Sequence, residues 1–203
     1  MAIKSLSSSS LANNVFYRSL LVGNDPFIPF IAADDLLEVI TLSSDASSVT
    51  FSGLGAYTDY QHLQIRLVGR SAEGTGGARD LYIRLNGDTG NNYAWHYLTG
   101  NGSSVFASAG TSTNTIAGRP TFPRDGNPAG EFGAAVVDLL DASSTSKNTT
   151  VRFLSGVVSG EDSIALSSGL FVDTSAITSI QLYQNIGDLA TGSRASLYGI
   201  KGA

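Results

Sequence analysis

The sequence predicts an all-β protein with the architecture of an antiparallel β-sandwich or jelly roll. Leu63, Ile65 and Leu67 alternate with polar or smaller residues, and Leu81 and Ile83 continue the same pattern after a glycine-rich break. Such a period of two gives a strand one apolar face to bury and one face to leave in water. Turn residues recur roughly every 8 to 15 positions, as in sandwiches. No strong helical period separates the strands, which disfavours a parallel α/β fold.

We expect about ten strands from residue 36 onward, each bounded by Gly, Ser, Asn or Asp. The expected strands are Leu36–Ser43, Ser48–Gly53, His62–Gly69, Asp80–Asn86, Tyr93–Thr99, Val105–Ala107, Gly130–Leu140, Thr149–Val158, Ser163–Val172, Ile177–Tyr183 and Ala195–Ile200.

Two segments differ from the simple strand pattern. The stretch Gly133–Asp141 is the best helix candidate, but its adjacent β-branched pair Val136-Val137 favours a strand. Ser108–Pro128 is rich in Gly, Thr and Pro, and we interpret it as a long connection. Asn86-Gly87 tolerates positive φ and is expected to close its strand as the start of a hairpin connection.

Residues 1–35 differ from the rest and are expected to form an extended N-terminal arm, followed by a β-sandwich domain over 36–203. A serine run is followed by a short apolar segment, and Pro26 and Pro29 favour extended backbone. The arm either folds back over its own domain or docks on a neighbouring subunit or capsid protein. The residues expected to make docking contacts are Phe16, Tyr17, Phe27, Ile28 and Phe30.

The composition excludes several classes of function. Charged residues make up 14% of the chain and the net charge is -5, which argues against the clustered Lys and Arg of a nucleic-acid-binding surface. The absence of cysteine removes disulfides, thiolate nucleophiles and cysteine-based zinc sites. No apolar run reaches the roughly 20 residues of a membrane span, and the N-terminus lacks the apolar core of a secretory signal.

The residues that could carry out catalysis are few and have no motif around them. His62 and His96 are the only histidines, and no G-x-S-x-G nucleophile motif accompanies them. Glutamates are scarce, and Asp138 and Asp141 near the end of one strand do not by themselves indicate glycoside hydrolysis. The oxygen-rich segment Asn86–Asn91 lacks the calcium-loop pattern, and a turn explains it. We therefore expect no enzyme activity and no cofactor or metal.

Tyr93, Trp95 and Tyr97 lie on one face of an expected strand. Aromatic rings arranged in this way pack in a core or at a subunit interface, which we favour, or they stack on sugars in a lectin-like site.

Several segments in the same order resemble a recurrent virion protein of tailed bacteriophages, including cyanophages. The resemblance rests on Tyr60–Arg66, Arg84–His96, Ser144–Arg152, Met1–Leu6 and Leu197–Gly202, and it covers most of the chain from Phe51 onward. It implies a jelly-roll-like β-domain on the outside of a particle, in either a head-decoration or a tail-fibre context.

The leading hypothesis is a non-enzymatic capsid decoration or cement protein that assembles into a virion in the host cytoplasm. Its expected partners are its own copies, as a homotrimer, and the major capsid protein or another virion protein, without nucleic acid or membrane. The alternative is a tail-fibre or receptor-binding module that recognises host surface glycans. A polysaccharide-degrading enzyme is a third class, and it predicts loss of host capsule or lipopolysaccharide on incubation with the protein.

Overall fold

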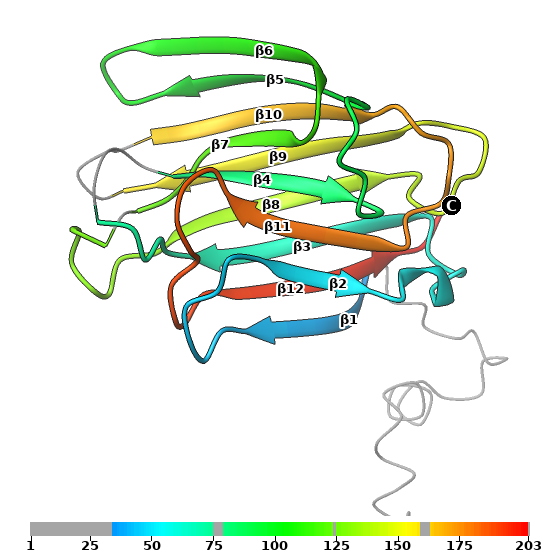
Figure 1. The fold of residues 1–203 in the computed structure, drawn as a ribbon, viewed down its shortest axis with the longest axis horizontal. Coiled ribbons are helices and arrows are strands. Elements are labelled where there is room, and N and C mark those ends of the chain that lie inside the picture. Colours follow the sequence, from blue (N-terminus) through cyan, green and yellow to red (C-terminus); the bar gives the residue numbers. More distant parts are fainter. Residues whose placement is uncertain (1–33, 75–78, 124, 159–162, 203) are drawn as a thin grey trace, which may run out of the picture. The chain divides into compact units, whose positions relative to one another are not determined.

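The computed structural model describes residues 34–74, 79–123, 125–158 and 163–202 (Figure 1). These residues form two antiparallel sheets that pack on each other as a sandwich, so the predicted fold class is confirmed. The one helical element among them is a single 3-10 turn at Leu54–Ala56.

The larger sheet has the strand order β1-β12-β3-β8-β9-β10-β5-β6 and the smaller has the order β2-β11-β4-β7. The strands of the larger sheet are β1 (Asp34–Thr41), β3 (His62–Gly69), β5 (Tyr93–Gly100), β6 (Val105–Thr113), β8 (Gly133–Leu140), β9 (Thr149–Val157), β10 (Ser163–Phe171) and β12 (Arg194–Ile200). Those of the smaller sheet are β2 (Val49–Ser52), β4 (Arg79–Leu85), β7 (Ile116–Phe122) and β11 (Ser179–Gln184).

The chain crosses from one sheet to the other at most of its connections, which is the wrapping of a jelly roll. Only β5 to β6 and β8 to β9 to β10 stay within one sheet. In Figure 1 the smaller sheet lies over the middle strands of the larger one, and β5 and β6 extend beyond it.

The Asn86-Gly87 turn forms, with φ of 54° and 66°, but it does not open a hairpin. It connects β4 in the smaller sheet to β5 in the larger sheet, so the expected hairpin connection is wrong. The local turn chemistry was readable in the sequence. Which strand pairs with β4 depends on the order of strands in the whole sheet, and the turn residues do not determine it.

The long connection expected over Ser108–Pro128 is also wrong, because β6 continues to Thr113 and β7 occupies Ile116–Phe122. The later part of β6 consists of Ala, Ser, Gly and Thr, so it offers no contrast between apolar and polar positions. β7 contains Pro120, which is compatible with a strand here because β7 is the edge of its sheet.

The core lies between the sheets and consists of the alternate residues that face inward. Ile65, Val137 and Phe153 of the larger sheet and Ile83 and Leu182 of the smaller sheet are all completely buried. Burial of such aliphatic and aromatic side chains is the main stabilising contribution, at about 1.5–3 kcal/mol for each.

Two glycines allow the sheets to approach closely. A Cβ added to Gly118 on β7 would lie 2.4 Å from the Phe153 ring, and one added to Gly169 on β10 would lie 2.3 Å from Ile116. Neither glycine has positive φ, so the reason for glycine is space rather than backbone conformation.

The four strands at the sheet edges differ in how they discourage pairing with another chain. β1 carries three carboxylates and a bulge, β2 has only 4 residues, and β7 contains Arg119 and Pro120. β6 has 9 residues with no charge and no proline. Charges, bulges, shortness and proline are the usual protections of an edge, and β6 has a bulge alone.

Candidate interaction surface

The two histidines lie in surroundings that explain them structurally. His62 Nδ1 accepts a hydrogen bond from the backbone N–H of Asp141 at 2.8 Å. The Asp141 carboxylate is held by Lys147 Nζ at 2.8 Å and Gln61 Nε2 at 2.6 Å, and the hydrogen bond from Lys147 lowers its pKa. His96 is exposed on the opposite face of β5 from the core. Within the described ranges, no group of three or more His, Asp or Glu residues could hold a metal ion.

Two other carboxylates form ion pairs between strands of the larger sheet. Asp138 on β8 lies 2.7 Å from Arg152 on β9, directly opposite it in the sheet, and accepts a hydrogen bond from Gln64 at 2.9 Å. Asp34 and Arg66 lie 3.2 Å apart on the surface. Each of these two carboxylates is therefore paired with an arginine.

The oxygen atoms of the segment that follows β4 are also used within the chain. Asp88 accepts hydrogen bonds from the Gly90 N–H at 2.6 Å and from Asn92 Nδ2 at 2.7 Å. The Asn86 amide binds the 176–179 segment, including the Thr178 N–H at 2.8 Å. The segment is therefore a hydrogen-bonded turn between the sheets.

The aromatic residues of β5 face inward, toward the other sheet. Tyr93 is 1% exposed, stacks on Phe171 with ring centroids 4.9 Å apart, and donates a hydrogen bond to the Leu85 carbonyl. Trp95 and Tyr97 stack on each other at 5.6 Å, and the Arg119 guanidinium lies over the Tyr97 ring at 5.2 Å. A sugar would need an open ring face, and Tyr93 offers none.

The residues expected to make docking contacts, Phe16, Tyr17, Phe27, Ile28 and Phe30, lie outside the described residues. Their role remains a prediction.

The surface that best fits a binding function is the outward side of the larger sheet. Four aliphatic residues on consecutive strands lie directly opposite one another there: Val136, Leu154, Leu166 and Leu98. Leu98, Leu154 and Leu166 are each more than half exposed. Val68, Ile164 and Val105 extend the patch beside this row, and Ile164 and Val105 are exposed by 63% and 72%. We call these seven residues the outer apolar face.

The outer apolar face is large for a protein that works alone. Its seven residues together expose roughly 700 Å², whereas the largest apolar patch on a typical soluble monomer is about 300–600 Å². An antiparallel sheet with one face in water usually carries polar residues on that face. The outer apolar face therefore indicates a surface that is covered in the working state.

The outer apolar face is not among the sites predicted above, although the sequence holds a signal for it. β9 and β10 are apolar at adjacent positions, as at Phe153-Leu154 and Ala165-Leu166, so both sides of these strands are apolar. Such strands occur where a sheet is covered on both sides. The smaller sheet covers only one side.

The chain was compared with protein-family models, curated proteins and solved structures, and none of them matches it. In the described part of the chain, no helix has the length and the hydropathy that crossing a membrane requires.

Proposed function

We propose that this protein is a non-enzymatic structural protein of a phage virion, which acts as a capsid decoration or cement protein. The observation that carries the proposal is the outer apolar face, which suits a domain that works bound to other macromolecules. The resemblance to phage virion proteins supplies the context of a particle. The jelly-roll sandwich agrees with the fold that this resemblance implies.

The arrangement of polar groups supports a structural role. His62 is engaged in a hydrogen bond, and Asp138 and Asp141 are engaged in ion pairs with Arg152 and Lys147. A hydrolytic site would require a nucleophile or an acid and a base around a space for the substrate. His62 and Asp141 instead hydrogen-bond to each other, and Lys147 and Gln61 hold the Asp141 carboxylate.

The mechanism follows from mass action. A protein that binds assembled capsid subunits better than dispersed subunits stabilises the shell in proportion to the free energy of that preference. The β-sandwich would contact its own copies, as the expected homotrimer, and the N-terminal arm would contact the major capsid protein or another virion protein.

The test is to locate the protein in intact particles of the phage that encodes it. Cryo-electron microscopy should show many copies on the head lattice, and heads stripped of the protein should break at lower temperature or force than heads to which it is added back. If only a few copies were found, at the tail tip, the cement function would be wrong and the tail-fibre alternative would be supported. Loss of host capsule or lipopolysaccharide on incubation with purified protein would overturn a non-enzymatic role.

A further inference from the structure

We propose that the outer apolar face packs against the outer apolar face of a second copy of this chain. The inference rests on the proposed function, because it assigns an occupant to the surface that carries that proposal. It concerns free protein in solution, so it can fail without any change in where the protein sits on a particle.

The side chains of the outer apolar face form a bulky row beside a row that contains two glycines. Val136, Leu154, Leu166 and Leu98 form a continuous bulky row over β8, β9, β10 and β5. The neighbouring row on the same four strands reads Ala134, Gly156, Ile164 and Gly100, so Ile164 projects between two positions that have no side chain. Sheets pack face to face by interdigitating such side chains. A second copy brings the same projections and the same empty positions.

None of the described residues requires Gly156 and Gly100 to be glycine. An added Cβ would meet only a backbone oxygen at 3.5 Å at Gly156 and 3.8 Å at Gly100, which are ordinary contacts. Neither has a positive φ. The inward glycines Gly118 and Gly169 differ, because a Cβ there would collide with the core. A strand glycine without an internal reason marks close approach by something outside the chain.

The charge of the chain also favours this occupant. Each chain has a net charge of -5, so copies repel one another over most of their surfaces. All seven residues of the outer apolar face are uncharged. Arg152 beside them is paired with Asp138 at 2.7 Å, Arg66 opposite Val136 is paired with Asp34 at 3.2 Å, and Arg194 lies opposite Val68 at the margin of the face. A surface that binds a nucleic acid, an acidic surface or a basic partner carries charges of the opposite sign to its ligand. An uncharged apolar face suits another copy of an acidic chain.

The size of the face agrees with this occupant. Its seven residues expose roughly 700 Å², and a specific interface of standard size buries about 800 Å² on each partner. A two-fold pair packs the two faces directly against each other, whereas in the expected trimer each face would meet parts of two neighbouring faces around the three-fold axis.

The experiment measures the mass of the full-length protein by sedimentation velocity over a micromolar concentration series. The wild type should sediment as an oligomer of two or three copies. Leu166→Glu places a charge at the centre of the bulky row and should weaken association at least tenfold, because an unpaired charge would be buried in the contact. Ile186→Glu is the matched control, since Ile186 is 53% exposed but lies outside the strands.

Gly156→Val tests the same contact by adding a side chain without a charge. A β-branched residue at this open position should preserve or raise the stability of the folded chain, yet it should weaken association by filling a space that the second copy needs. Urea unfolding of each variant verifies the fold.

A monomeric wild type overturns the proposal, as does an oligomer that neither variant weakens. If the proposal fails but particle imaging still shows the protein on heads, the cement function stands with a different partner on this face.

Discussion

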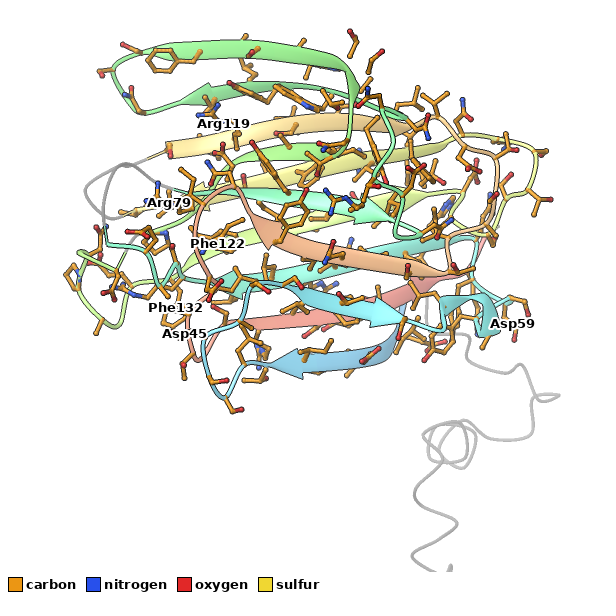
Figure 2. The ribbon with its side chains drawn as sticks, viewed as in Figure 1. Asp45, Asp59, Arg79, Arg119, Phe122 and Phe132 are labelled. Carbon is orange, nitrogen blue, oxygen red and sulfur yellow. The ribbon has the colours of Figure 1, made fainter. Side chains whose placement is uncertain are left out.

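The Asp80 carboxylate is 3% exposed and lies 3.0 Å from Arg119 Nε, so an ion pair joins β4 to β7 at the end of the smaller sheet. Figure 2 shows Arg119 with Arg79 and Phe122 at this end of the sandwich. Burial raises the pKa of Asp80 to about 6, although Arg119 and Arg79 lower it. Asp80 Oδ1 accepts no hydrogen bond from the described residues, which adds to the cost of holding a charge there.

This pKa shift predicts a dependence of stability on pH. The folded state binds a proton at Asp80 more readily than the unfolded state, so the contribution of this group to stability is largest below the ordinary aspartate pKa of 3.8 and is lost as pH rises through about 6. Between pH 7.5 and pH 5 the wild type should gain about 1 kcal/mol in its free energy of unfolding relative to Asp80→Asn. Urea unfolding at both pH values measures the difference.

Asp173→Asn is the control for that comparison. The Ser175 backbone N–H holds the pKa of Asp173 below its ordinary value, so acidification cannot stabilise the protein through this residue. Parallel pH profiles for the wild type and Asp80→Asn would contradict the assignment to Asp80.

Arg70→Lys should destabilise the fold by about 3 kcal/mol, because charged donors to buried acceptors contribute strongly. The Arg70 side chain is 6% exposed, and its guanidinium donates to four backbone carbonyls between residues 125 and 131, at 2.6–3.2 Å. A lysine ammonium cannot reach four acceptors with a planar fork. Thermal unfolding and proteolysis within 125–131 provide the measurement. Arg66→Lys, at a 52% exposed ion pair, should change stability by less than about 0.5 kcal/mol.

Gly118→Ala should destabilise the sandwich by about 1–3 kcal/mol, the usual cost of forcing a methyl group into a filled core. The new Cβ would lie 2.4 Å from the ring of Phe153, which is fully buried and has no room to move. Gly156→Ala adds the same methyl group on the outward side and is the matched control, with a free energy of unfolding equal to or above that of the wild type. Equal losses for both variants would contradict the collision with Phe153, because replacing glycine by alanine lowers the entropy of the unfolded chain and by itself stabilises the fold.

Deletion of residues 1–30 should abolish binding to particles and leave a folded β-sandwich. The apolar residues of this segment are expected to supply the docking contacts, and the strands begin at Asp34. Circular dichroism checks the fold, and co-sedimentation with stripped heads checks binding. A truncated protein that still decorates heads would show that the arm is not the anchor.

Most strands could be predicted from the sequence because each buries alternate residues on one face. The turns between them are also recognisable by their Gly, Ser, Asn and Asp residues. Leu63, Ile65 and Leu67 are buried as their alternation indicated. β7 was missed because Gly118 and Pro120 are usual signs of a loop, and their meaning as strand residues depends on a sheet edge and on a ring from the opposite sheet.

The candidate surface could not be predicted in the same way. Leu154, Leu166 and Leu98 are far apart in the chain, and they form one row only because β9, β10 and β5 are neighbours in this register. A one-residue shift in register would scatter the row. The Asp80–Arg119 pair likewise depends on the pairing of β4 with β7.

The unequal protection of the sheet edges limits how many molecules can join strand to strand. In the described part of the larger sheet, β6 is an uncharged edge, while the β1 edge carries Asp34, Asp35 and Glu38. If two molecules paired through their β6 strands, both uncharged edges would be hydrogen-bonded. The acidic β1 edge of each molecule would then lie at the two ends of the joined sheet. Growth of this kind stops at two molecules, so the unequal edges of the larger sheet oppose its extension into a fibril.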